Sequence, residues 1–244
     1  MSKGTLWLIP TPLGEVAPAA VMPAAAIERA RAISYFIAEE PKSARAFLKS
    51  IAHSQPIASL RIEKLDLHTP ANEIPALLKP VMEGADAGVL SEAGCPALAD
   101  PGANLVRCAH REGIRVIPLA GPSSIVLALM ASGLETQRFA FHGYLPVKEP
   151  GRSRAIQTLE KRSRERSETQ IFIETPYRND AMMGALLSAC RPGTSLCVAT
   201  DLTLANESVA TRRIVEWRSS ARPIGKRPSV FLLLAEQSGR LRGP

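Results

Sequence analysis

Residues 91–102, SEAGCPALADPG, gather several groups that could do chemistry in one short stretch. Glu92 and Asp100 could act as general bases or orient a substrate, and Cys95 could be a nucleophile or a metal ligand. The same stretch holds two prolines and two glycines, which suit a rigid loop that presents backbone N–H and C=O groups to a ligand. A metal, a nucleophile, a phosphate and a backbone-bound ligand are therefore all candidates at this point.

The distribution of cysteine and histidine argues against a metal or thiol site. The four cysteines show no CxxC spacing and the four histidines are scattered, so no zinc or other metal site is expected. Cys95 has no histidine near it in the sequence and is followed by Pro96, an unfavourable setting for an activated thiolate. We interpret Cys95 as a small residue in the wall of a ligand site.

Five loops that each follow an apolar, strand-like run point to one ligand site. Their sequences are PTPLGE (10–15), SEAGCPALADPG (91–102), AGPSS (120–124), ETPYRN (174–179) and TDLTLANE (200–207). In open α/β sheets ligands bind beyond the carboxyl ends of the strands, so these loops are expected to converge. The chain has no GxGxxG, GxxxxGK[ST] or GxSxG motif. The pattern therefore predicts a nucleoside-like ligand that is held by backbone groups rather than by a phosphate cradle.

The elements that must position these loops alternate between strands and helices. In residues 1–120 we expect strands at 5–9, 34–38, 87–91 and 115–119, with helices at 23–33, 42–51 and 101–112. This pattern predicts an α/β lobe with a parallel sheet, in which Asp100 caps the helix that follows it. Residues 121–244 are expected to form a second α/β lobe, with strands at 139–144, 170–174, 195–201 and 230–236. Short connections there predict a mixed sheet.

The composition and net charge of the chain indicate where the protein is located and what kind of partner it binds. The chain has 244 residues, a formal net charge of +7 and 45% hydrophobic residues. Its apolar runs are shorter than the roughly 20 residues that cross a bilayer, so we expect a cytoplasmic protein that does not contact the membrane. The positive charge favours an acidic partner, either a nucleic acid or a small polycarboxylate.

Residues 148–166 form a strongly basic run, KEPGRSRAIQTLEKRSRER. It holds seven Lys or Arg against three Glu. Such a run is often a solvated helix face, but its arginines could also hold RNA phosphates. The candidates for substrate binding are Arg152, Arg154, Arg162 and Arg164.

The loop sequences together resemble a known family. IPTPLG, IAEE, SEAGCPALADPG, PLAGPSSI, ETPYR and DLT, in this order between Thr5 and Leu234, are similar to the tetrapyrrole methylase superfamily of S-adenosylmethionine (SAM)-dependent methyltransferases. The likeness is greatest to the branch of the 16S ribosomal RNA 2′-O-ribose cytidine methyltransferases. The resemblance implies a two-lobed fold with SAM in the cleft between the lobes, and a homodimer. The positions that it implies for SAM binding are Pro12, Leu13, Gly14, Gly94, Cys95, Pro96, Leu98, Ser123, Ser124, Ile125, Thr175, Pro176, Tyr177, Leu202 and Pro228.

The chain departs from that branch in the loops themselves. Glu15 stands where the branch usually has Asn, EAGCP (92–96) replaces D-A-G-T-P, and AEEPK (38–42) replaces A-E-D-T-R. These changes raise the question whether the methyl acceptor differs from that of the branch, or whether activity is lost.

The leading hypothesis is methylation of a ribose hydroxyl of ribosomal RNA. The alternatives are methylation of a tetrapyrrole precursor or other small molecule, and a non-catalytic SAM-binding regulator. Candidate catalytic residues are Glu92, Glu174 and Arg178.

Overall fold

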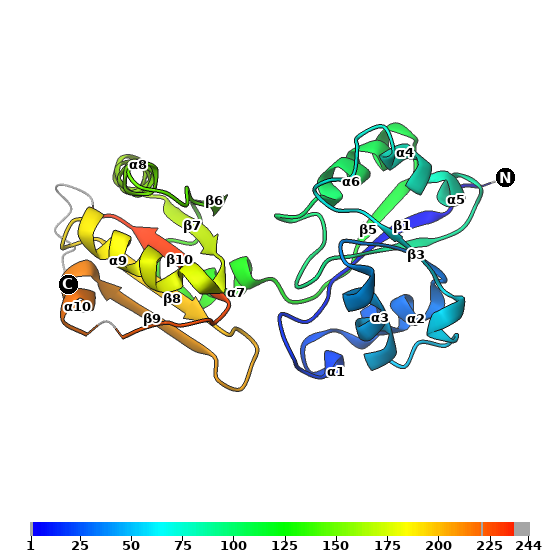
Figure 1. The fold of residues 1–244 in the computed structure, drawn as a ribbon, viewed down its shortest axis with the longest axis horizontal. Coiled ribbons are helices and arrows are strands. Elements are labelled where there is room, and N and C mark those ends of the chain that lie inside the picture. The colour runs from blue at the N-terminus through cyan, green and yellow to red at the C-terminus, as the bar shows by residue number, and fades with distance from the viewer. Residues whose placement is uncertain (1, 221, 237–244) are drawn as a thin grey trace. The chain divides into compact units, whose positions relative to one another are not determined.

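The chain folds into two compact units, Met1–Ser123 and Ser124–Pro244. The computed structural model describes residues 2–220 and 222–236 (Figure 1). The predicted boundary lies between residues 120 and 121, in the segment that joins the two units. No helix in the described part of the chain is long and apolar enough to cross a membrane.

The N-terminal unit is built on a sheet of five parallel strands in the order β3-β2-β4-β1-β5. The strands are β1 (Thr5–Ile9), β2 (Tyr35–Ala38), β3 (Arg61–Lys64), β4 (Ala87–Leu90) and β5 (Arg115–Pro118). The parallel sheet confirms the predicted architecture of this unit. The edge strand β3 was not predicted, because its sequence RIEK has too few apolar residues to read as a buried strand.

Helices cover both faces of this sheet. They are α1 (Pro18–Val21), α2 (Ala24–Ala32), α3 (Pro41–Ser50), η1 (Ile57–Ser59), α4 (Ile74–Leu77), α5 (Lys79–Met82) and α6 (Gly102–Arg111). One core cluster joins Ile9 and Phe36 to α2 and α3, and the other joins Leu6 and Ile37 to α4 and α6. Neighbouring residues of one strand thus enter opposite cores, as the pleat requires. Every residue of β2 and β4 is consequently buried.

A glycine in β4 allows the close packing of this sheet. A Cβ atom at Gly88 would lie 2.7 Å from Cδ1 of Phe36 and 2.8 Å from Cδ1 of Ile9. Both of these side chains are fully buried. The ring of Phe36 therefore occupies the space that any larger residue at position 88 would need.

The C-terminal unit has a mixed sheet in the order β6-β7-β10-β8-β9. Only β6 and β7 run parallel, and the other pairs are antiparallel, which confirms the predicted mixed sheet. The strands are β6 (Phe139–Tyr144), β7 (Thr169–Glu174), β8 (Ser195–Thr200), β9 (Ser208–Arg213) and β10 (Ser229–Leu234). The helices are α7 (Ser124–Ser132), α8 (Gly151–Arg166), η2 (Pro176–Arg178), α9 (Asn179–Ala189) and α10 (Ile214–Ser220).

The core of this unit lies between its sheet and α8, α9 and α10. Phe172 of β7 and Phe231 of β10 stack with ring centroids 5.6 Å apart, and both are fully buried. The edge strand β9 and the short helix α10 had no counterpart in the predicted elements. Their residues are mostly polar and exposed, so the apolar periodicity that marks a strand or helix is weak there.

Candidate functional site

The loops that follow β1 and β4 are joined by a two-residue bridge. The N–H of Thr11 donates to the carbonyl of Gly94 at 2.9 Å, and the N–H of Gly94 donates back at 3.0 Å. Gly94 has a φ of +78°, and a Cβ atom there would lie 3.2 Å from Cδ2 of Leu13. The bridge therefore brings together Leu13 and Gly94, two of the predicted cofactor residues, and requires a glycine at position 94.

The loop after β5 joins the same cluster. The thiol of Cys95 donates to the carbonyl of Pro122, with the sulfur 3.5 Å from the oxygen. Gly121 lies so close to the first loop that a Cβ atom on it would be 2.2 Å from Cγ of Pro10. Three of the five predicted loops thus converge within the N-terminal unit, at the carboxyl ends of its strands. Burial raises the pKa of the Cys95 thiol, which disfavours the nucleophilic thiolate.

Asp100 organises the end of the 91–102 loop. Its Oδ1 atom accepts hydrogen bonds from the N–H groups of Ala97 and Gly102, both at 2.8 Å. These bonds hold a loop in which Ala97 and Ala99 have positive φ angles of 64° and 66°. Asp100 thus satisfies the N–H of Gly102, the first residue of α6, although the N-cap residue of this helix is Pro101.

A third carboxylate, Glu39, lies with Asp100 and Glu92 at this edge of the sheet. It follows β2 directly, and its own N–H donates to the carbonyl of Leu90 at the end of β4. Burial raises the pKa of the Glu39 carboxyl, and the negative charges of Asp100 and Glu92 raise it further. A hydrogen bond from the backbone N–H of Glu92 opposes this rise. Glu39 can therefore act as a base whose proton affinity exceeds that of an ordinary carboxylate.

Glu92 was among the predicted catalytic residues, whereas Glu39 was not. Glu92 is exposed, whereas Glu39 is half-buried. The signal that would have found it is the rule used for the other loops, since Glu39 is the first residue after a buried strand. The Glu40 that follows it accepts a hydrogen bond from the N–H of Lys42 and so caps α3.

In the C-terminal unit, Glu174 and Arg178 form an ion pair at the end of β7. Nε and Nη2 of Arg178 lie 2.8 and 2.5 Å from Oε1 of Glu174, which also accepts the N–H of Thr175 at 2.7 Å. The Glu174 side chain is 1% exposed and that of Arg178 is 32% exposed. The three bonds fix the start of the ETPYRN loop, and they engage only one of the two oxygens of Glu174.

Several buried polar atoms near these loops lack a partner. Of the four such side-chain atoms in the described part of the chain, three are Oε2 of Glu174, Oδ1 of Asn179 and Oγ1 of Thr203. Buried polar groups are almost always hydrogen-bonded, and a bound ligand would supply the partners that these three oxygens lack. All three lie in or next to the 174–179 and 200–207 loops, which the sequence associated with a cofactor.

Asn179 and Asp201 tie a further segment to these two loops. Nδ2 of Asn179 donates to the carbonyls of Gly225 and Arg227 at 2.9 and 2.7 Å. The N–H of Asp201 donates to the carbonyl of Pro228 at 3.0 Å. The predicted residues Leu202 and Pro228 therefore flank one connected cluster in the C-terminal unit.

The other predicted cofactor residues are distributed between the two units. Pro12, Gly14, Pro96 and Leu98 lie in the loops of the N-terminal unit, and Ser123 is its last residue. In the C-terminal unit, Ser124 and Ile125 begin α7, and Thr175, Pro176 and Tyr177 lie at the end of β7 and in η2. Their contact with a cofactor stays a prediction.

The basic run forms α8, and three of its four candidate arginines face carboxylates. Nε of Arg152 is 2.9 Å from Glu149, Nε of Arg162 is 2.7 Å from Glu168, and Nη2 of Arg164 is 3.5 Å from Glu160. Arg154 is exposed and forms no ion pair within the described ranges. Internal pairing thus compensates much of the positive charge that the sequence showed on this helix.

A family model and relatives of known name both match most of this chain. The family model described as Tetrapyrrole (Corrin/Porphyrin) Methylases matches residues 5–216. The chain is 31% identical over 208 residues to "Ribosomal RNA small subunit methyltransferase I" of Escherichia coli O157:H7, covering 85% of this chain and 68% of that protein. It is 30% identical over 241 residues to the protein of the same name from Halalkalibacterium halodurans, covering 97% and 77%.

Solved structures show the same fold. The methyltransferase CobJ superposes with a TM-score of 0.62 at 17% identity, over 98% of this chain and 97% of that one. Uroporphyrin-III-C-methyltransferase from Thermus thermophilus superposes with a TM-score of 0.55 at 18% identity, over 96% and 93%. At these identities the likeness concerns the fold alone.

Proposed function

Because the chain belongs to the tetrapyrrole methylase family, we propose that it transfers a methyl group from SAM to a ribose hydroxyl of small-subunit ribosomal RNA. The observation that carries this proposal is the similarity to proteins named ribosomal RNA small subunit methyltransferase I, which extends over 97% of the chain at 30% identity. The enzymes of corrin and porphyrin synthesis resemble it at only 17–18% identity, which supports the fold but not their substrates.

The residues present suit SAM as the cofactor. In the N-terminal unit, Gly94 and Gly121 bring backbone from three loops together, and this suits a ligand bound through N–H and C=O groups. In the C-terminal unit, Glu174 and Asn179 each hold a buried oxygen without a partner beside the predicted loops. When bound, SAM supplies a methyl group that its sulfonium has already activated.

The remaining chemical task is to orient the acceptor hydroxyl and to remove its proton. Glu39 is the group we propose as the base, because its raised pKa increases its affinity for that proton. Glu92, whose N–H donates to Glu39, would hold the base in place and contribute its own negative charge. Neutral, protonated Cys95 would serve only as part of the wall, through its bond to Pro122.

Two measurements test the function. Calorimetry with S-adenosylhomocysteine should show about one binding site per subunit, and folded protein that does not bind it would exclude a SAM enzyme. Purified protein with labelled SAM should then transfer methyl groups to small ribosomal subunits from a strain that lacks this activity. Label found instead in a small-molecule pool would favour a tetrapyrrole precursor, and cofactor binding without transfer to any pool would indicate a regulator.

We also propose that the protein is a homodimer, as the family resemblance implies. Sedimentation equilibrium of the full chain should give twice the mass of 26.2 kDa. A single species at the mass of one chain, at the concentrations used for methyl transfer, would exclude the dimer.

A further inference from the structure

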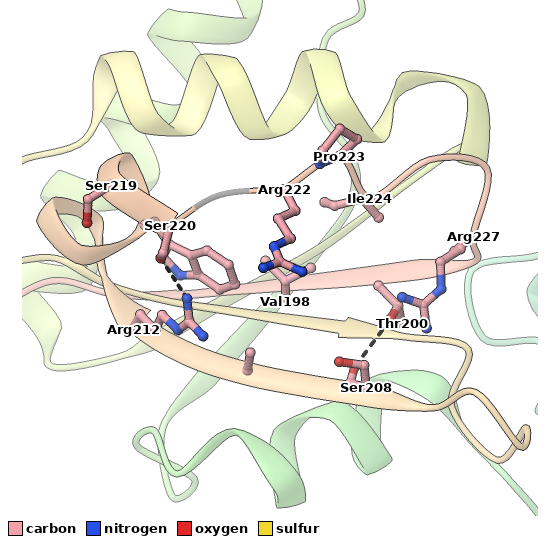
Figure 2. Close-up of a pocket in the computed structure, with 12 residues that line it drawn as sticks. Val198, Thr200, Ser208, Arg212, Ser219, Ser220, Arg222, Pro223, Ile224 and Arg227 are labelled. Carbon is pink, nitrogen blue, oxygen red and sulfur yellow. Dashed lines mark hydrogen bonds between the residues drawn. The ribbon is translucent and has the colours of Figure 1, made fainter.

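The C-terminal unit contains a pocket that was not predicted from the sequence. Its volume is about 840 Å³, within the range of known ligand sites (Figure 2). Strands β8 and β9, helix α10 and the segment 222–227 form its walls. The lining residues are Val198, Thr200, Ser208, Ala210, Arg212, Trp217, Ser219, Ser220, Arg222, Pro223, Ile224 and Arg227.

The floor of the pocket follows from strand pairing. Val198 of β8 pairs with Ala210 of β9, and Thr200 pairs with Ser208, so all four point to the same face of the sheet. Thr211 points to the opposite face, where its hydroxyl donates to the carbonyl of Ser132 at the end of α7. Because the floor residues of β9 are small, the sheet leaves open space between α10 and the 222–227 segment.

The lining carries positive charge without an acidic residue. Among the described residues that line the pocket there are three arginines, Arg212, Arg222 and Arg227, and neither Asp nor Glu. A group of cationic side chains with no acidic residue in the same lining attracts negative charge, so this composition favours an anionic ligand.

Two of these arginines are held in place by neighbours. Nη1 of Arg212 donates to Oγ of Ser220 at 2.6 Å, and its guanidinium lies 5.0 Å from the centroid of the Trp217 ring. Arg227 is paired with Asp201, outside the lining, at the other end of the pocket. Both groups are therefore positioned before any ligand arrives, which lowers the entropy cost of binding.

Arg222 differs from both, because it forms no ion pair or hydrogen bond within the described ranges. Figure 2 shows its guanidinium directed toward the floor, between Arg212 and Arg227. It also differs from Arg152, Arg162 and Arg164 of α8, each of which faces a carboxylate. Arg222 is thus available to an incoming anion.

The donors of this pocket suit the phosphates of a nucleic-acid backbone. Four hydroxyl side chains, of Thr200, Ser208, Ser219 and Ser220, lie among the arginines. Those of Thr200, Ser219 and Ser220 donate to backbone carbonyls of the protein itself. The donors that face a ligand are therefore mainly the guanidinium groups, and arginine is a usual donor to phosphate oxygens. Resting on the proposed action on ribosomal RNA, we propose that this pocket binds backbone phosphates of the RNA substrate, with Arg222 as the principal contact.

The test compares two substitutions that remove the same charge. Arg222→Gln alters the pocket. Arg191→Gln removes an exposed arginine that lies two residues after the end of α9 and has no side-chain partner in the described part of the chain. Binding of a short fluorescein-labelled single-stranded RNA is measured by anisotropy over a range of salt concentrations. Each phosphate contact contributes about 0.7 to the slope of log K against log salt for a single strand.

We expect Arg222→Gln to weaken RNA binding and to reduce the magnitude of that slope by about 0.7, with Arg191→Gln close to wild type. Arg222→Lys should restore most of the slope, because the charge is retained. Equal slopes for Arg222→Gln and Arg191→Gln would overturn the proposal.

Two further measurements separate this proposal from others. Calorimetry with S-adenosylhomocysteine should give the same affinity for Arg222→Gln and wild type, and a weakened affinity would assign the pocket to the cofactor and overturn the proposal. If wild-type protein binds RNA with the expected slopes but transfers no methyl group to small subunits, the proposed function fails while the phosphate site stands.

Discussion

Thr11 and Gly94 exchange both of their backbone hydrogen bonds, at 2.9 and 3.0 Å, although each follows a different strand. This reciprocal pair fixes the distance between the loops after β1 and β4. It depends on a φ of +78° at Gly94, a conformation that side chains with a Cβ adopt only at a cost. Adding a single methyl group at position 94 should therefore disturb the arrangement of the predicted cofactor loops.

Gly94→Ala should lower both stability and cofactor affinity. The left-handed conformation costs roughly 1–2 kcal/mol for a residue with a Cβ, and the new methyl group would press on Leu13. Thermal unfolding and calorimetry with S-adenosylhomocysteine measure the two effects. The matched control is Gly113→Ala, at a φ of +61° after α6, which should lose stability without losing affinity. Equal affinity losses in both variants would contradict a local role for Gly94.

Glu39→Gln should lower kcat for methyl transfer by about 10²-fold, because the amide cannot accept the proton of the acceptor hydroxyl. In the wild type, kcat should rise with pH through the raised pKa of Glu39, and this rise should disappear in the variant. Glu28→Gln, on the exposed side of α2, serves as the control. A variant with wild-type kcat and an unchanged pH profile would rule Glu39 out as the base.

The same residue predicts a pH effect on stability. Because folding raises the pKa of Glu39, its contribution favours the folded state at acidic pH, below the unfolded pKa, and is lost as pH rises through the folded pKa. Glu39→Gln should therefore gain stability relative to wild type as the pH rises from acidic to neutral. Urea unfolding of both proteins across this interval measures the difference, and a constant difference would contradict the assigned pKa shift.

Cys95→Ser should keep most of the wild-type methyl transfer. The thiol is protonated because burial raises its pKa, and its bond to the carbonyl of Pro122 can be made by a hydroxyl. Alkylation of Cys95 by iodoacetamide should be slow near neutral pH and should accelerate as the solution becomes alkaline. Loss of all activity in the folded serine variant would revive the nucleophile hypothesis.

A double-mutant cycle distinguishes a structural from a catalytic role for the Glu174–Arg178 pair. Glu174→Gln, Arg178→Gln and the double variant should show a coupling energy in urea unfolding of about 1 kcal/mol or more, at or above the upper end for exposed ion pairs. The low exposure of Glu174 is the reason for the larger value. Coupling near zero, with a large loss of kcat in both single variants, would instead favour direct roles in catalysis.

Much of the fold was predictable from apolar runs. The strands containing Phe36 and Val89 are buried on both faces, so each forms a continuous apolar segment in the sequence. The edge strands β3 and β9 escaped prediction, because their residues are largely polar and exposed. The bond from Gly102 at the start of α6 to Asp100 was predictable, since such bonds depend on neighbours in the sequence, although the N-cap residue is Pro101.

The sequence alone determined the family, the sheet types and the loops that follow the strands, because these depend on local patterns of residues. Tertiary structure alone decided which side chains from distant segments meet. Glu39 acquires its raised pKa only because parallel pairing of β2 with β4 brings it near Glu92 and Asp100. Likewise, Arg212 and Arg222 line one pocket because the register of β8 and β9 and the return of the chain after α10 place them there. Such placements depend on pairing and burial across long sequence separations, which no local pattern encodes.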